Sequence, residues 1–90
     1  MKIKIHIQDI NQTVEVKDAG EALSNLKAEA AARAPFLVRG VIKAMGEVQF
    51  AQEAVKRDNA ASGRKDTLPQ SAAEFLDWAS ARGYATITEP

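Results

Sequence analysis

The residues that could do chemistry in this chain are mostly cations. Lys56 and Arg57 precede a polar stretch that ends in Arg64 and Lys65, with Ser62-Gly63 between the two pairs. Four cations beside a flexible glycine-containing backbone could hold a phosphate group or the backbone of a nucleic acid. The stretch is not a Walker sequence, and cations near the end of a helix also complement its dipole. These four residues form our candidate anion-binding group.

Trp78 and Arg82 are the candidate residues for a protein interface. They lie four residues apart on a predicted helix, so the guanidinium could stack on the indole. Trp78 falls at the border of the apolar stripe of that helix, and aromatic and arginine side chains are favoured as interface anchors. A single tryptophan in such a place more often completes the core of its own domain, so both interpretations stay open.

Groups that could support catalysis are scarce. His6 is the only histidine and lies on the polar side of a predicted strand, where a solvated side chain is the simpler interpretation. The chain has no cysteine and no visible carboxylate cluster for a metal ion. Glu74 and Asp77 are neighbours on a helix, but capping and dipole complementarity explain both. We therefore predict no catalytic residue, no metal site and no cofactor.

The elements that would position these residues begin with a β-hairpin. Residues 2–8 alternate in polarity, with three isoleucines on one side, which is typical of a half-buried strand. Turn residues follow at 9–12, and residues 13–17 alternate again with two valines inward. Because a two-stranded ribbon is marginal in water, the hairpin needs a third strand, which residues 84–88 can supply.

Helices are predicted between the hairpin and the last strand. Asp18 and Glu21 form a capping box that opens the first helix, and Pro35 stops it. Residues 36–61 form either one continuous helix or two helices separated near Gly46, and we favour a break because glycine weakens a helix. The second piece would then group four apolar residues on one face: Phe50, Ala51, Ala54 and Val55.

The last helix carries the clearest local signals. A polar loop over residues 59–68 leads to it, and Ser71 and Glu74 form a second capping box in which Glu74 reaches back to the Ser71 amide. Gly83 stands where a helix ends in a left-handed residue, and a strand follows at once. A strand that leaves a helix so abruptly indicates a sheet that is already in place.

The pattern predicts one α+β domain over residues 1–90. A three-stranded, mainly antiparallel sheet, made of the N-terminal hairpin and the C-terminal strand, is covered on one face by three to four helices. The predicted core consists of Ile3, Ile5, Ile7, Val14, Val16, Leu23, Leu26, Val41, Met45, Phe75, Leu76 and Ile87.

Composition and charge narrow the class of function. The net charge is zero, although residues 33–65 carry seven basic and three acidic residues and residues 66–90 carry one basic and four acidic ones. The sequence has neither a signal peptide nor an apolar run of membrane-spanning length, so we expect a cytoplasmic protein without membrane contact. The expected function is a non-catalytic protein-binding or regulatory module, with an unidentified protein partner or self-association as a homodimer. The alternative is a nucleic-acid-associated accessory protein that uses the basic loop at residues 56–65.

Overall fold

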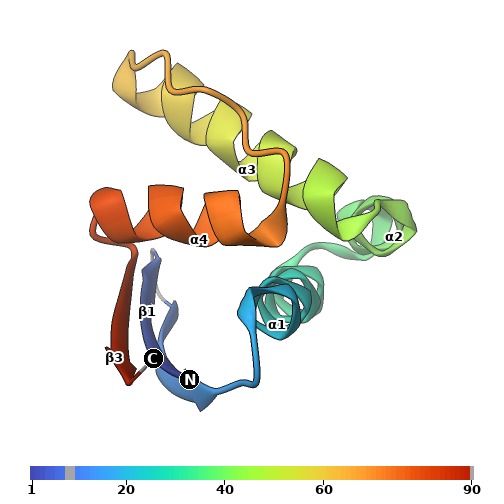
Figure 1. The fold of residues 1–90 in the computed structure, drawn as a ribbon. Coiled ribbons are helices and arrows are strands. Elements are labelled where there is room, and N and C mark those ends of the chain that lie inside the picture. Colours follow the sequence, from blue (N-terminus) through green and yellow to red (C-terminus); the bar gives the residue numbers. More distant parts are fainter. Residues whose placement is uncertain (8–9, 90) are drawn as a thin grey trace.

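The computed structural model describes residues 1–7 and 10–89. Its elements follow the predicted order (Figure 1): β1 (Lys2–Ile7), β2 (Ile10–Glu15), α1 (Ala19–Arg33), α2 (Phe36–Ala44), α3 (Glu47–Ser62), α4 (Ala72–Ala81) and β3 (Ala85–Glu89). Within these described residues, no helix combines the length and the apolar character needed to cross a membrane.

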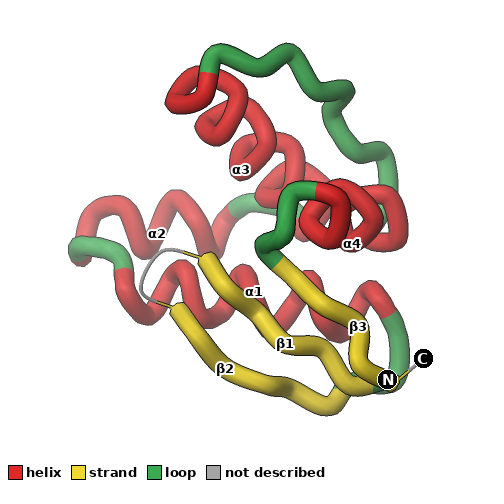
Figure 2. The backbone as a smooth tube through the Cα atoms, turned by 90° about the vertical axis from the view of Figure 1, so that its left-hand side faces the viewer, coloured by secondary structure: helices red, strands yellow, loops and turns green. Residues whose placement is uncertain are grey.

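A three-stranded antiparallel sheet forms one layer of the molecule, with the strand order β2-β1-β3 (Figure 2). In the middle strand, Ile3 lies opposite Val14 of β2 and opposite Ile87 of β3. Pairing between β1 and β3 joins segments from the two ends of the chain, and the helices cover one face. The predicted fold class is therefore confirmed.

The hairpin differs from the prediction in the bounds of its second strand. β2 begins at Ile10, so residues 10–12 belong to the strand, and the prediction that they form a turn is wrong. Because Ile3 pairs with Val14, the same pairing places residues 10–12 opposite β1. The hydrogen bonds between the two strands outweigh the turn propensity of these residues. Gln8 and Asp9, also assigned to this region, lie outside the described residues.

Side-chain caps begin α1 and α4 as predicted. Asp18 Oδ1 accepts a hydrogen bond from the amide of Glu21 over 2.9 Å, and Ser71 Oγ accepts one from the amide of Glu74 over 3.1 Å. The Glu74 carboxylate reaches back to the amide of Gln70 at 2.9 Å, one residue earlier than the Ser71 amide that we expected. These bonds satisfy first-turn donors that the helix itself leaves unpaired.

The break near Gly46 is present, so residues 36–61 contain two helices. α2 ends at Ala44, and Gly46 takes the N-cap position of α3. α3 continues to Ser62, and Gly63, with φ of 76°, ends it, so the predicted polar loop starts later than residue 59. All four residues of the predicted inward face join the core: Phe50, Ala51, Ala54 and Val55.

The core lies between the sheet and the helices α1 and α4, with α3 packed over both helices (Figure 1). Half of the predicted core residues are buried, namely Ile3, Ile5, Val16, Leu23, Leu26 and Phe75. Val14 and Leu76 pack against these residues. Alanines outside the list of predicted core residues complete the interior: Ala22, Ala51, Ala79 and Ala85. Small side chains there allow the helices to approach the sheet closely.

Three residues of the predicted core lie outside the observed core. Val41 is 57 % exposed and Met45 is half-buried, because α2 turns its other side toward α1. Ile87 is 40 % exposed, since α4 covers only the start of the edge strand β3, which then runs away from that helix (Figure 1). The predictions for these three residues are wrong. The side chain of Ile7, also predicted to be buried, lies outside the described part of the structure.

Candidate functional site

Arg82 lies in a polar cluster formed by α3, α4 and the residues next to them. Its Nη2 is 3.4 Å from Oδ2 of Asp58, and its Nη1 is 3.9 Å from Oδ2 of Asp66. The guanidinium also lies 5.8 Å from the ring centroid of Tyr84, whose hydroxyl donates a hydrogen bond to Asp58 Oδ1. With 17 % of its side chain exposed, Arg82 is held mainly by charges and rings of its own chain.

Trp78 belongs to the same cluster. Its Nε1 donates a hydrogen bond to Asp66 Oδ2 over 3.0 Å, and its ring stacks on Phe75 at a centroid distance of 5.7 Å. The centroid of the Tyr84 ring lies 5.6 Å from the centroid of the Trp78 ring. The aromatic ring under the Arg82 guanidinium is thus that of Tyr84, and both candidate interface residues are engaged within the domain. An interface role for Trp78 and Arg82 stays a prediction.

The surroundings of Asp66 favour its charged form. The hydrogen bond from Trp78 lowers the pKa of Asp66 despite partial burial, and the charges of Arg64 and Arg82 lower it further. Asp66 is therefore ionised at neutral pH. Within the described residues, Asp58 Oδ2 and Arg82 Nε are buried without a hydrogen bond, so the 3.4 Å approach of Arg82 Nη2 to that oxygen is an electrostatic contact.

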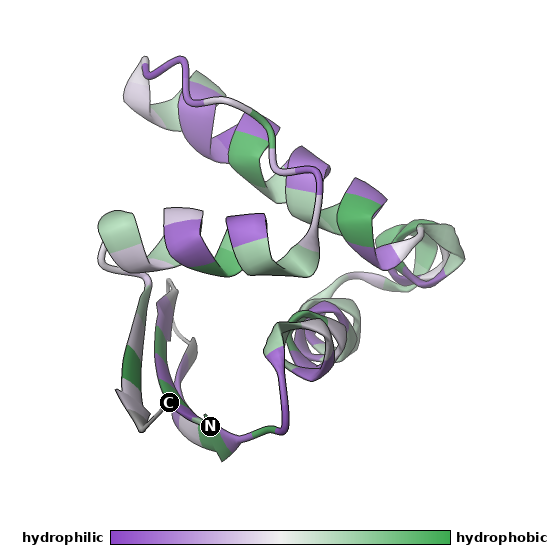
Figure 3. Ribbon diagram, in the orientation of Figure 1, coloured by the Kyte–Doolittle hydropathy of each residue, from purple (hydrophilic) through white to green (hydrophobic). Residues whose placement is uncertain are grey.

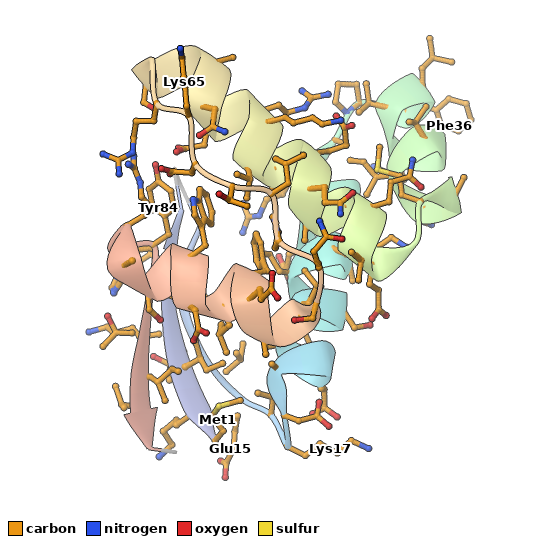
Figure 4. All side chains as sticks on the ribbon, turned by 45° about the horizontal axis from the view of Figure 1, so that its top comes forward. Met1, Glu15, Lys17, Phe36, Lys65 and Tyr84 are labelled. Atoms are coloured by element: carbon orange, nitrogen blue, oxygen red, sulfur yellow. The ribbon has the colours of Figure 1, made fainter. Side chains whose placement is uncertain are left out.

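The candidate anion-binding residues lie in the last part of α3 and just after it: Lys56, Arg57, Arg64 and Lys65. Lys56 Nζ is 3.4 Å from Glu53 Oε1, and Arg64 Nε is 3.4 Å from Asp66 Oδ2. Lys65 is exposed at the outer end of this region (Figure 4). Two of the four cations already face carboxylates, which reduces the positive charge that an anion would meet. Anion binding at these residues stays a prediction.

The interior offers little room for a ligand. The void between the sheet, α1 and α4 has a volume of about 20 Å³ and an apolar lining that includes Ile3, Leu23 and Phe75. Small-molecule pockets are larger by an order of magnitude, at roughly 300–1,000 Å³. Among the described residues, no group of three or more histidine, cysteine or acidic side chains could hold a metal ion.

The most unusual outer surface is the apolar side of α2, which the sequence-based analysis did not single out. α2 lies wholly within the described residues, and none of its nine residues is buried. We define the α2 surface by four side chains: Phe36 at 84 % exposure, Leu37 at 81 %, Val41 at 57 % and Val38 at 42 %. Figure 3 shows α2 largely in green at the edge of the molecule, and in Figure 4 Phe36 points away from the rest of the molecule.

The polar side of α2 is turned inward, which explains this exposure. Arg39 Nε donates to the carbonyl oxygen of Ala31 over 3.1 Å, and its Nη2 lies 3.5 Å from that of Ala34. The Ala31 carbonyl also accepts a hydrogen bond from the amide of Ala34. Both carbonyls lie at the C-terminal end of α1, where a cation is favoured. From α1, Lys27 Nζ donates to the carbonyl of Met45 just after α2. α2 is thus anchored by its cationic side and its apolar side faces outward.

A groove of about 560 Å³ lies beside the α2 surface, between α1 and α2. Among the described residues that line it, three are cations and one is a carboxylate: Lys27, Arg39, Lys43 and Glu47. Small residues of α1 complete the lining: Ser24, Ala28, Ala31 and Ala32. Arg39, which lines the groove, is a helical neighbour of Phe36, which lies three residues earlier, so the groove and the α2 surface share an edge. The sequence signal for this site was a short helix, rich in apolar residues, isolated between Pro35 and Gly46.

Comparison with known proteins finds no matching family model, no matching curated protein and no matching solved structure. The function of this domain has to be inferred from its own surfaces. The α2 surface carries the two most exposed large apolar side chains of the described residues, Phe36 and Leu37, and the groove beside it carries the cations Lys27, Arg39 and Lys43.

Proposed function

We propose that this domain is a non-catalytic, cytoplasmic protein-binding module that docks through the α2 surface. The observation that carries this proposal is the almost complete exposure of Phe36 and Leu37 on a helix without a buried residue. Covering one large apolar side chain contributes about 1.5–3 kcal/mol, so a partner that covers both gains substantially from this surface. Clustered apolar groups of this kind are the usual centre of a protein interface.

The way α2 is held also supports docking. The bonds from Arg39 to Ala31 and from Lys27 to Met45 attach the middle of α2 and the residue after its end to α1. A partner therefore meets a helix that is already folded and oriented, which lowers the entropic cost of binding. The alternative function, nucleic-acid association through the basic loop, has weaker support because Lys56 and Arg64 already face carboxylates.

Site-specific photo-cross-linking in the native cell tests the proposal. A photoreactive amino acid at position 37 should form adducts with another protein, and the change Phe36→Ser in the same chain should abolish them. The matched control places the photoreactive group at the exposed position of Asp77 on α4, where we expect no comparable adduct. Because Phe36 is exposed, Phe36→Ser should leave the thermal unfolding temperature unchanged. Equal adduct formation at the two positions, or none at position 37, would refute docking through α2.

A further inference from the structure

We propose that the partner presents an acidic amphipathic helix to this domain. Its apolar side covers the α2 surface, and its carboxylates enter the groove between α1 and α2. This inference rests on the proposed function and adds the chemistry of the partner. It follows from the shared edge of two features, an apolar surface with Phe36 at its border and a groove whose lining includes three cations and one carboxylate.

The positive charge of the groove favours a partner with negatively charged side chains. Lys27 and Arg39 donate to main-chain carbonyls, which are neutral, so both side chains keep their full positive charge in the groove. Lys43 is exposed at its rim. A carboxylate in this groove is attracted, whereas a lysine there is repelled. Since salt screens charges beyond about 8 Å at physiological ionic strength, the partner's carboxylates must enter the groove to gain this attraction.

The shape of the groove favours a helix. Its volume of about 560 Å³ accommodates several side chains, and its α1 wall carries small groups at Ser24, Ala28 and Ala32 beside Lys27. A helix can lie close to such a wall while its apolar residues, three and four positions apart, reach the neighbouring α2 surface. This arrangement corresponds to the helix-in-groove mode of peptide recognition.

Two other occupants fit less well. A second copy of the chain, docked through α2 about a twofold axis, would bring Lys43 and Arg39 of both copies toward each other. A bilayer surface is flat, so its anionic headgroups would meet Lys43 at the rim and leave the groove unfilled. An acidic helix satisfies both the apolar surface and the cations.

Selection from a displayed peptide library tests this inference. The library consists of amphipathic helices with apolar residues varied on one side and glutamate, glutamine or lysine varied at the flanking positions. It is depleted on the Phe36→Ser/Leu37→Ser double variant and then selected on the unaltered chain. We expect glutamate to be enriched at the flanking positions. The selected peptides should lose about tenfold or more in affinity for Lys43→Glu, and affinity should fall with salt.

Matched variants make each outcome decisive. Lys17→Glu carries the same charge change at an exposed residue well away from Phe36 (Figure 4) and should bind the selected peptides with little change. Because Lys43 is exposed, Lys43→Glu should unfold at the temperature of the unaltered chain. Peptides that need Phe36 and Leu37 but are neutral and insensitive to Lys43→Glu would overturn the acidic partner while docking through α2 stands.

The remaining outcomes separate the two proposals. If no selected peptide depends on Phe36 and Leu37, docking through α2 fails and the acidic partner fails with it. A dimer seen by light scattering and abolished by Phe36→Ser would instead make a second copy the occupant. Vesicles of phosphatidylserine and phosphatidylcholine that bind the chain more tightly than any selected peptide, with the same dependence on Phe36, would assign the surface to lipid.

Discussion

Trp78 Nε1 donates a hydrogen bond over 3.0 Å to Oδ2 of Asp66. The same oxygen lies 3.4 Å from Nε of Arg64 and 3.9 Å from Nη1 of Arg82. On its other side, the amide of Asp66 donates to Oδ1 of Asn59 in α3 over 3.1 Å. Asp66 thereby attaches the segment between α3 and α4 to both helices.

Acid should weaken this attachment. The hydrogen bond from Trp78 lowers the pKa of Asp66 in the folded chain. Its stabilising contribution is complete above the unfolded-state pKa of about 4 and is lost as the pH falls through the lower folded-state pKa. Below about pH 4, the unfolding temperature of the unaltered chain should therefore fall more steeply than that of Asp66→Asn. Thermal unfolding followed by Trp78 fluorescence measures both slopes.

The control for this experiment is Asp77→Asn, which removes an exposed carboxylate from the same helix as Trp78. It should keep the steep slope of the unaltered chain. Identical slopes for the unaltered chain and Asp66→Asn would show that the Trp78 bond does not stabilise the charged form.

Tyr84→Phe should lower the free energy of unfolding by about 1–2 kcal/mol. The change removes the hydroxyl that donates to Asp58 and keeps the ring beside Arg82 and Trp78. Chemical denaturation measures the loss. In an Asp58→Ala background the same change should cost much less, and a loss of unchanged size there would rule out this hydrogen bond as the cause.

Val55→Ala should destabilise the domain by about 2 kcal/mol, because Val55 is fully buried in α3 and its truncation leaves a cavity. Val41→Ala removes the same atoms from an exposed position on α2 and should change stability by less than about 0.5 kcal/mol. Denaturant unfolding of the two variants compares them directly. Similar losses would mean that α2 buries its apolar side, contrary to the structure.

Two glycine substitutions should change the stability of the domain in opposite directions. Gly83 ends α4 with φ of 79°, where an alanine is strained, so Gly83→Ala should cost about 1–2 kcal/mol. Gly40 lies within α2, and a Cβ there meets no atom of the described chain within 4 Å. Gly40→Ala should therefore stabilise the domain by up to about 1 kcal/mol through helix propensity. A stabilising Gly83→Ala, measured by thermal unfolding, would contradict the left-handed helix end.

The fold class could be predicted because its signals are local and agree with one another. The caps at Asp18 and Ser71 and the helix end at Gly83 each depend on only a few neighbouring residues. Alternation around Ile3 and Ile5 marks the strand face that is buried. The start of β2 was missed because it depends on pairing with β1, which the turn propensity of residues 10–12 does not report.

The candidate site was largely missed for a related reason. One continuous helix over residues 36–61 was the other interpretation, but the break at Gly46 separates Val41, which is exposed, from Val55, which is buried. The residue that orients α2 is Arg39, through carbonyls that become available only where α1 ends beside it. No spacing within α2 reveals that contact.

The sequence by itself determined the starts of α1 and α4, the stop of α1 before Pro35 and the end of α4 at Gly83, because caps, proline and glycine act over a few residues. Only the tertiary structure decided which sides of those elements are covered. Val41 and Ile87 have the apolar character of core residues and remain exposed, since burial needs an opposing element and neither residue has enough cover. Arg82 and Trp78, equally suited to a surface role, are drawn together with Asp58 and Asp66 because the packing of α4 against α3 brings their charges and hydrogen-bonding groups within reach.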